Sequence, residues 1–189
     1  MVGFEEDIEQ CLIQLQAGGI ILYPTDTLWG LGCDATNNEA VERLIALKGK
    51  PLNKGLIVLL PSERDLIRYI AAPDLEIFPF LEGFENPTTV VYEHGLGVAD
   101  SVLNEDGSIA IRVVKEDFCR HLLKRFKKPI VSTSANFHGQ PSPQHFKEIK
   151  DTLKNGVDYV VHFRQSDTKV ARSSSIIKWV NGHVVNIRQ

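Results

Sequence analysis

Short apolar runs alternate with amphipathic segments along most of this chain, and this alternation constrains the fold more than any single motif. Short apolar runs are typical of buried strands, whereas apolar residues three and four apart predict one face of a helix. The predicted strands span residues 20–23, 56–60, 88–92, 109–114, 129–132 and 157–163, and a final hairpin spans 174–180 and 183–188 around Asn181-Gly182.

The predicted helices complete an α/β pattern. They cover residues 5–17, 73–81, 116–126 and 143–153, with two more capped by Asn38 and Ser62. The Asn38 helix is expected to end at Gly49-Lys50-Pro51. Strands and helices alternate early while hairpins occur late, so we predict an α/β fold around a mixed sheet.

Composition narrows the class of protein. The chain has 189 residues, 43% of them apolar, which is too apolar for intrinsic disorder. At about 150 residues per domain, residues 1–189 are expected to form a single domain. No apolar run is long enough to span a bilayer, and the acidic start lacks the features of a signal peptide.

Charge and cysteine content exclude further classes. The net charge is −3, from 21 Lys and Arg against 24 Asp and Glu, which argues against nucleic-acid binding by the whole surface but leaves open a local basic cleft. The three cysteines, Cys11, Cys33 and Cys119, are odd in number and form no CxxC pair. This excludes a complete disulfide framework or a cysteine zinc site, and it predicts buried free thiols in a reducing cytoplasm.

Two polar clusters follow predicted elements in the first third of the chain. The segment 23–32 places Thr25, Asp26 and Thr27 beside an aromatic and two glycines in a predicted loop. It is either a substrate loop or an ordinary turn in which the threonines act as local caps. Next, Lys48, Lys50 and Lys54 can present ammonium groups to one polyanion, although Lys48 and Lys50 could simply complement a helix dipole.

Two further clusters occur later. The strand at 129–132 runs into the hydroxyls and amide of Ser132-Thr133-Ser134-Ala135-Asn136, where ligands of open α/β sheets gather. Arg112 interrupts an apolar strand, either on the outward face of an edge strand or aimed into a cleft, and Arg188 is a second strand cation. Hydroxyls, amides and cations without an obvious nucleophile would bind and position anions, as nucleotidyl transfer requires.

In this order and spacing, the clusters resemble the YrdC family of threonylcarbamoyl-AMP synthases, in its short single-domain bacterial form, over about residues 5–188. Tyr23-Pro24-Thr25-Asp26-Thr27 resembles the opening fingerprint, Lys48-Gly49-Lys50-Pro51 the K-x-R-P element, and Ser134-Ala135-Asn136 the S-x-N element. Lys50 stands where the family usually has Arg, His138 where a small Ser is common, and Asn86-Pro87-Thr88 replaces a usual Pro-Gly-Pro turn.

The resemblance implies a twisted mixed sheet with flanking helices, a concave basic cavity and a nucleotidyltransferase activity. Family members make threonylcarbamoyl-AMP and pyrophosphate from L-threonine, bicarbonate or CO₂, and ATP with Mg²⁺. A separate transferase complex then uses the product to modify adenosine 37 of tRNA. We expect the protein to be cytoplasmic. No metal ligand is assigned among its residues, and whether Mg²⁺ contacts protein side chains or only the ATP phosphates stays open.

The resemblance also implies roles for individual residues. The catalytic set would be Lys48, Lys50, Ser134 and Asn136. Threonine would contact Thr27, Arg112, Ser134 and Ser174. ATP would contact Lys48, Lys50, Lys54, Ser108, Ser134, Asn136 and Arg188.

Two other readings belong to different functional classes. One is a non-catalytic paralogue that binds double-stranded RNA or tRNA, with a surface extended by Arg120, Lys124, Arg125, Lys127 and Lys128. The other is a carbamoyl-adenylate domain like those of hydrogenase maturation proteins, but those chains are much longer and carry cysteine motifs that this sequence lacks.

Overall fold

The computed structural model describes residues 3–49, 55–74, 76–84, 86–168, 172–180 and 183–188, without the side chains of 82, 186 and 188. Its strands are β1 (Ile21–Tyr23), β2 (Gly30–Asp34), β3 (Ile57–Leu60), β4 (Thr88–Tyr92), β5 (Ile109–Val113), β6 (Ile130–Ser134), β7 (Tyr159–Val160), β8 (Ser175–Val180) and β9 (His183–Arg188). Its α-helices are α1 (Glu5–Gln16), α2 (Asn38–Leu47), α3 (Ile77–Glu82), α4 (Asp117–Phe126) and α5 (Asp151–Lys154).

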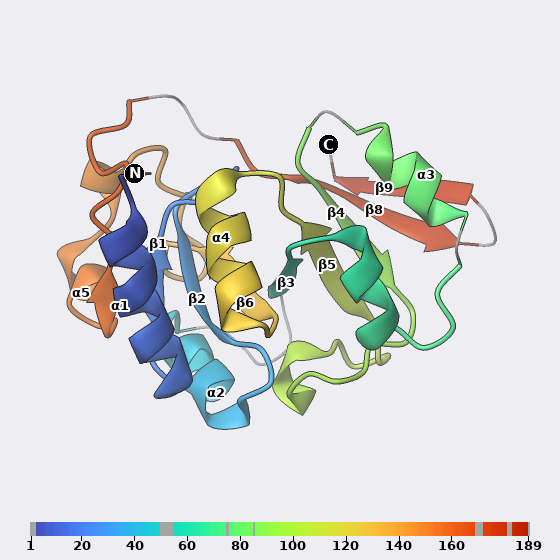
Figure 1. The fold of residues 1–189 in the computed structure, drawn as a ribbon, viewed down its shortest axis with the longest axis horizontal. Coiled ribbons are helices and arrows are strands. Elements are labelled where there is room, and N and C mark those ends of the chain that lie inside the picture. Colours follow the sequence, from blue (N-terminus) through green and yellow to red (C-terminus); the bar gives the residue numbers. More distant parts are fainter. Residues whose placement is uncertain are drawn as a thin grey trace.

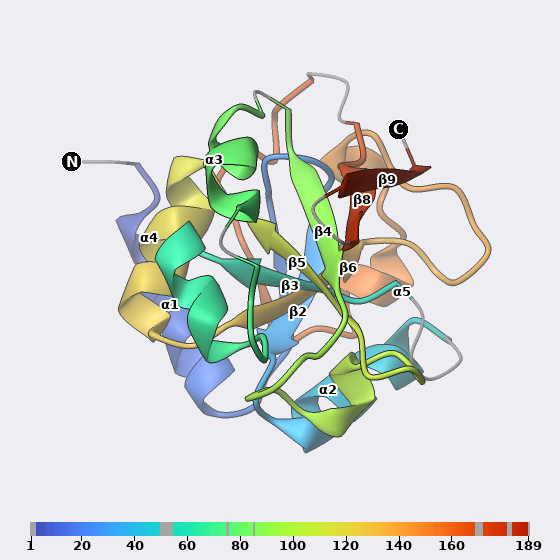
Figure 2. The ribbon, with the colours of Figure 1, turned by 90° about the vertical axis from the view of Figure 1, so that its right-hand side faces the viewer.

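The strands in the described ranges form one twisted sheet of nine, in the order β7-β1-β2-β6-β3-β5-β4-β8-β9 (Figures 1 and 2). The pairs β1–β7, β3–β5 and β4–β8 are parallel, and the remaining neighbours are antiparallel. The predicted mixed α/β sheet is therefore confirmed. The β8–β9 hairpin lies at the opposite end of the sheet from β7 (Figure 1).

Two amphipathic helices cover one face of the sheet, as their periodicity predicts. Helix α1 buries Ile8, Cys11 and Leu15, and α4 buries Phe118 and Leu122. The two helices pack side by side against the half of the sheet that contains β1, β2 and β3 (Figures 1 and 2). Apolar burial on this face supplies much of the driving force for folding.

The strand β2 begins inside the segment 23–32 that the sequence predicts as a loop, so that prediction is wrong for residues 30–32. The strand pairs with both β1 and β6, and Gly30 lies opposite Ser134. The two glycines leave room for their neighbours: a Cβ on Gly32 would lie 2.7 Å from the Tyr23 ring. The register brings the polar segments around Thr25 and Ser134 together.

Several predicted boundaries need correction. The predicted helix at 143–153 is wrong over most of its length, because only Asp151–Lys154 is α-helical and Phe146–Glu148 is a 3₁₀ turn. The strand predicted at 157–163 is confined to Tyr159–Val160. The helix predicted at 73–81 begins only at Ile77.

The two predicted caps also differ from expectation. The cap of α2 is Asn37, whose side chain accepts from the Ala40 N–H at 3.1 Å, and Asn38 is the first helical residue. Ser62 precedes a 3₁₀ helix at Glu63–Arg68, and its hydroxyl donates to Asp65 instead of accepting a backbone N–H. The turn at Asn181-Gly182 lies outside the described residues, although β8 and β9 pair as predicted.

The three cysteines are free and buried, which confirms the predicted thiols. Burial raises the pKa of the Cys11, Cys33 and Cys119 thiols, so they stay protonated. In the described part of the chain, every helix is too short or too polar to cross a membrane.

Candidate active site

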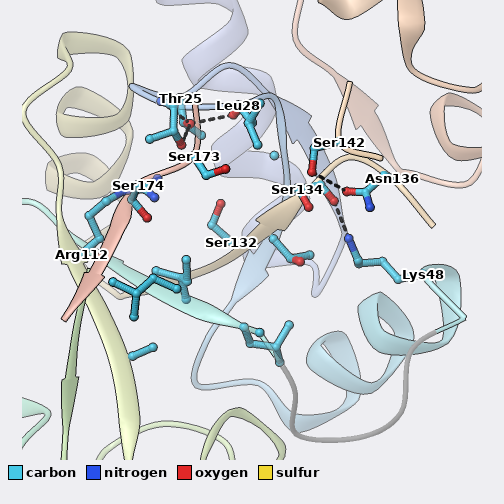
Figure 3. Close-up of a pocket in the computed structure, with 18 of the residues that line it drawn as sticks. Thr25, Leu28, Lys48, Arg112, Ser132, Ser134, Asn136, Ser142, Ser173 and Ser174 are labelled. Carbon is cyan, nitrogen blue, oxygen red and sulfur yellow. Dashed lines mark hydrogen bonds between the residues drawn. The ribbon is translucent and has the colours of Figure 1, made fainter. Parts of the chain in front are cut away.

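A cavity of about 430 Å³ opens where β5 and β6 meet the loop after β1, the end of α2 and the segment before β8 (Figure 3). It gathers residues that are far apart in the sequence. The predicted site residues that line it are Thr27, Lys48, Arg112, Ser134, Asn136 and Ser174. Other polar residues on its wall are Thr25, Asn104, Ser132, Thr133, His138, Ser142 and Ser173.

The remaining predicted site residues lie elsewhere or are not described. Ser108 is buried behind the wall, where its hydroxyl accepts from the amide of Asn104 at 2.9 Å. Lys50 and Lys54 lie outside the described residues, as does the side chain of Arg188. The cavity is therefore observed, while its basic character, which depends largely on these cations, stays a prediction.

Lys48 lies at the end of α2, yet its side chain is only 3% exposed. Its ammonium group donates a hydrogen bond to the carbonyl oxygen of Ser134. Its own carbonyl accepts from the N–H of His138 at 3.0 Å. A lysine that only complemented the helix dipole would extend into solvent, so this burial favours a role at the cavity (Figure 3).

The hydroxyls after β1 form a small network. The Thr25 hydroxyl donates to the Leu28 carbonyl at 2.7 Å and accepts the Thr27 N–H at 3.0 Å. Thr25 therefore caps the turn, as one of the two interpretations of this segment requires. The same hydroxyl lies 3.0 Å from that of Thr27, so the turn also fixes the Thr27 hydroxyl at the cavity wall.

The segment after β6 uses Asn136 to shape its own loop. The Asn136 amide nitrogen donates to the carbonyls of Phe137 at 3.0 Å and Gln140 at 2.7 Å. Its oxygen accepts from the Ser142 hydroxyl at 3.5 Å (Figure 3). Ser134 and Ser132 precede this loop on the strand, and a Cβ on the facing Gly30 would lie 2.9 Å from the Ser132 hydroxyl.

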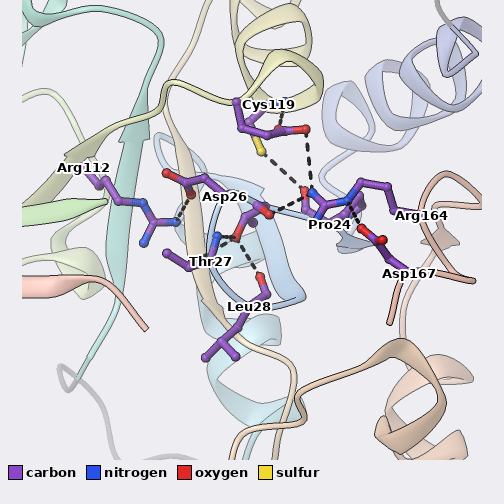
Figure 4. A network of polar contacts seen from close by, with 10 residues as sticks. Pro24, Asp26, Thr27, Leu28, Arg112, Cys119, Arg164 and Asp167 are labelled. Carbon is purple, nitrogen blue, oxygen red and sulfur yellow. Dashed lines mark hydrogen bonds and ion pairs between the residues drawn. The ribbon is translucent and has the colours of Figure 1, made fainter. Parts of the chain in front are cut away.

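Arg112 is buried, with 4% of its side chain exposed, in a strand that lies between β3 and β4. The interpretation that places it on the outward face of an edge strand is therefore wrong. Its Nη2 atom forms an ion pair with Oδ1 of Asp26 at 3.1 Å (Figure 4). The sequence identifies each residue as a candidate, but it gives no sign that they meet.

Residues from other parts of the chain anchor the loop that carries Thr25 and Asp26 (Figure 4). Arg164 donates to the Thr25 carbonyl at 3.0 Å, and the Cys119 thiol donates to the Pro24 carbonyl at 3.4 Å. Arg164 has a φ of 65° and also pairs with Asp167 at 2.9 Å. Neither Arg164 nor Asp167 belongs to a recognisable motif, so the sequence alone could not assign them to the site.

The last wall of the cavity comes from the segment that enters β8. Ser174 is 3% exposed, and its hydroxyl lies 2.8 Å from that of Thr89 on the neighbouring β4. Ser173 and Ile176 line the cavity beside it. The wall thus presents hydroxyls between Arg112 and Lys48, which lie on opposite sides of the view in Figure 3.

This arrangement can bind an extended ligand with an anionic group at each end. Arg112 can take a carboxylate through charge-assisted hydrogen bonds, and the Lys48 side can face a second anion. Buried hydroxyls and amides between them can orient the middle of such a ligand. None of the described cavity residues is an activated nucleophile, so positioning and electrostatics are what the site offers.

Comparisons with known proteins agree with this fold. The Sua5/YciO/YrdC family model, described as Telomere recombination, matches residues 14–189. A threonylcarbamoyl-AMP synthase of Vibrio campbellii is 31% identical over 182 residues, which cover 92% of this chain and 98% of that protein.

Two solved structures of Sua5 from P. abyssi share the fold. A variant aligns with a TM-score of 0.86 at 24% identity, over 97% of this chain and 56% of that one. A complex with L-threonine aligns with a TM-score of 0.82 at 24% identity, over 97% of this chain and 54% of that one. The chain therefore spans little more than half of the P. abyssi protein in these structures. Because the family model covers nearly the whole sequence, the chain belongs to the Sua5/YciO/YrdC family.

Proposed function

We propose that this protein is an L-threonylcarbamoyladenylate synthase, a nucleotidyltransferase that makes threonylcarbamoyl-AMP and pyrophosphate from L-threonine, bicarbonate or CO₂, and ATP. The observation that carries the proposal is that Arg112 and Lys48 lie on opposite sides of one hydroxyl-lined cavity. The names of the bacterial relatives and the threonine complex of P. abyssi Sua5 support it.

In the proposed chemistry, the amine of threonine adds CO₂ to give N-carboxy-threonine. The new carboxylate attacks the α-phosphorus of ATP in line, and pyrophosphate leaves with the electrons of the broken P–O bond. Arg112, with Thr27 and Ser174, binds threonine through its α-carboxylate and hydroxyl. No covalent intermediate on the protein is needed.

The nucleotide side of the site rests on cations and amides. Lys48, Lys50 and Lys54 face the phosphates, and Ser134 and Asn136 orient the two substrates, with Arg188 completing this side. Ser108 acts from behind the wall, where it accepts a hydrogen bond from the amide of Asn104. Mg²⁺ enters bound to ATP, whose phosphate oxygens are ligands that this ion prefers. The product supplies a downstream transferase complex that modifies adenosine 37 of tRNA.

A binding protein for double-stranded RNA or tRNA remains the alternative outcome of the test. Part of the basic surface expected for it is already compensated, since Arg125 pairs with Glu5 and Glu9, and Lys128 pairs with Asp34 at 2.7 Å. This pairing weakens the argument from charge.

The test is an incubation with ATP, bicarbonate and labelled L-threonine, followed by detection of pyrophosphate and threonylcarbamoyl-AMP. Arg112→Ala should weaken threonine binding by about 10- to 150-fold, the loss of one charge-assisted pair, with a much smaller effect on ATP. Ser134→Ala should lower turnover without lowering the melting temperature. Absence of turnover together with salt-sensitive RNA binding would reject the synthase in favour of the alternative.

A further inference from the structure

We infer that Asp26 is a positioning residue that holds the guanidinium of Arg112 in its ligand-binding orientation and acts on the substrate only through Arg112. This inference rests on the proposed function, because it assigns the carboxylate of threonine to Arg112. It adds a residue that lies off the cavity wall.

The contact itself is short and buried. Nη2 of Arg112 lies 3.1 Å from Oδ1 of Asp26, and the two side chains are 4% and 12% exposed. In the described part of the chain, this ion pair is the one polar contact of the guanidinium. It acts through charge and proximity, since neither the buried Nε of Arg112 nor the buried Oδ1 of Asp26 has a hydrogen-bond partner. Without Asp26, no other described contact of this kind would hold the direction of the guanidinium.

Asp26 approaches Arg112 from outside the substrate cavity. It lines a second, mainly apolar cavity of about 180 Å³, together with Ile111 and Val113 of β5. The alternation of side chains along a strand places Ala110 and Arg112 on the wall of the first cavity instead. The carboxylate can therefore restrain the guanidinium without occupying the space of the substrate.

The surroundings strengthen this restraint. Leu81, Phe84 and Val90 line the same cavity as Asp26, and apolar walls weaken the screening of an ion pair. The cavity also has a cation, Lys115, whose ammonium group donates to the Phe84 carbonyl at 2.6 Å. The backbone of the loop is fixed just before Asp26, by Cys119 at Pro24 and by Arg164 at Thr25 (Figure 4). The restraint on Arg112 is therefore transmitted from a loop that is itself anchored.

The consequence is selective. A misdirected Arg112 loses its alignment with the α-carboxylate of threonine, whereas the phosphates of ATP lie toward Lys48 on the far side of the cavity in the proposed function. Loss of Asp26 should weaken threonine binding and leave ATP binding nearly unchanged. A purely structural role would weaken both ligands together.

The experiment is a double-mutant cycle on threonine binding with Asp26→Ala, Arg112→Ala and the double variant. Each single variant should weaken L-threonine by about 10-fold or more, as expected for one charge-assisted contact. Because Asp26 acts through Arg112, the double variant should bind no more than about 2-fold weaker than Arg112→Ala alone. Losses that multiply in the double variant would overturn the inference.

A substrate analogue gives a second readout. The protein should prefer L-threonine to L-threoninamide, which lacks the negative carboxylate, and Asp26→Ala should reduce this preference. Asp151→Ala is the control, because the exposed Asp151 pairs with Lys154 in α5, outside the network that holds Asp26 and Arg112. Its effect should combine independently with that of Arg112→Ala. An unchanged preference in Asp26→Ala contradicts the proposed role.

Two precautions separate the possible failures. If the Asp26→Ala variant does not fold, the same cycle is run with Asp26→Asn, which keeps the size of the side chain and removes its charge. If the unmodified protein makes no threonylcarbamoyl-AMP yet binds threonine, the synthase proposal fails while the cycle still tests Asp26. If the unmodified protein is active but the cycle is multiplicative, only the role of Asp26 is rejected.

Discussion

Lysine occupies position 50, where the family usually has arginine, and this difference makes the position a sharp test of the phosphate side. We expect Lys50→Arg to preserve or improve ATP affinity, since the planar guanidinium offers a second donor to a phosphate. Lys50→Ala should lose about 1.5–3 kcal/mol of ATP binding, and Lys50→Glu should lose more. Calorimetric titration with ATP measures all three. An unchanged ATP affinity in Lys50→Glu would show that Lys50 does not contact the ATP phosphates.

A second residue, Asp7, links α1 to the segment after β7. Its carboxylate accepts from the Tyr159 hydroxyl at 2.7 Å and from the N–H groups of His162 at 2.9 Å and Phe163 at 2.8 Å. Burial by itself raises the pKa of Asp7, but these hydrogen bonds outweigh it, and the pKa lies below its usual 3.8. A lowered pKa means that the charged form stabilises the fold.

This stabilisation should be complete above the usual pKa and should be lost as the pH falls through the lowered one. Asp7→Asn should therefore reduce the free energy of unfolding at pH 7 by about 1.5–3 kcal/mol, the value of hydrogen bonds to a charged group. The difference from the unmodified protein should shrink below about pH 3.9. Urea unfolding at several pH values measures it, with the exposed Glu6→Gln as control. A difference that stays constant down to pH 3 would contradict the argument.

At the scale of elements, the strand β2 packs into the sheet only because residue 32 is a glycine. A Cβ on Gly32 would lie 2.7 Å from Cε1 of Tyr23 and 2.9 Å from the carbonyl of Val131, both within the packed sheet. We expect Gly32→Ala to destabilise the fold by about 1–3 kcal/mol through overpacking. Gly83→Ala is the control, since its nearest contact would be an ordinary 3.5 Å. Chemical unfolding should separate the two, and equal stabilities would refute the packing argument.

The same glycines explain why the sequence predicts this region poorly. Glycine has a low strand propensity, so Gly30 and Gly32 hide the strand from a sequence-based prediction. Gly32 is required because Tyr23 and Val131 on neighbouring strands leave no room for a Cβ, and a single sequence does not reveal these neighbours. By contrast, the periodic apolar faces of α1 and α4 are local, so the sequence predicts those helices closely. The helix predicted at 143–153 is interrupted, because Ile149 and Lys150 have extended backbone angles between the 3₁₀ turn and α5.

The candidate site shows the same limit. Local pattern identifies Lys48, Ser134 and Arg112 as unusual polar residues, and the structure brings them to one cavity. The pairing of Arg112 with Asp26 and the anchoring by Arg164 depend on strand order and on a loop far along the chain. A single sequence does not determine such contacts, because they follow from the register of the complete sheet.

At the scale of the whole molecule, the cavity is built from segments that span most of the chain, from Thr25 to Ile187. A ligand that binds there stabilises the folded state as a whole. We expect ATP and L-threonine each to raise the melting temperature as their concentration increases. At a ligand concentration 100 times Kd, the free energy of unfolding should rise by about 2.7 kcal/mol. Thermal unfolding with increasing ligand measures this shift. L-threoninamide should shift it less, and an equal shift would argue against recognition of the carboxylate.

The buried cysteines can report local opening of the folded structure. Cys11 lies in α1, Cys33 in β2 and Cys119 in α4, all three protonated and shielded from solvent. An alkylating reagent attacks the thiolate, so each sulfur reacts only when its surroundings open. Mass spectrometry of labelled peptides would time those openings separately for two helices and one strand. Because Cys119 also holds the Pro24 carbonyl, its labelling rate would report how often the substrate loop loses that anchor.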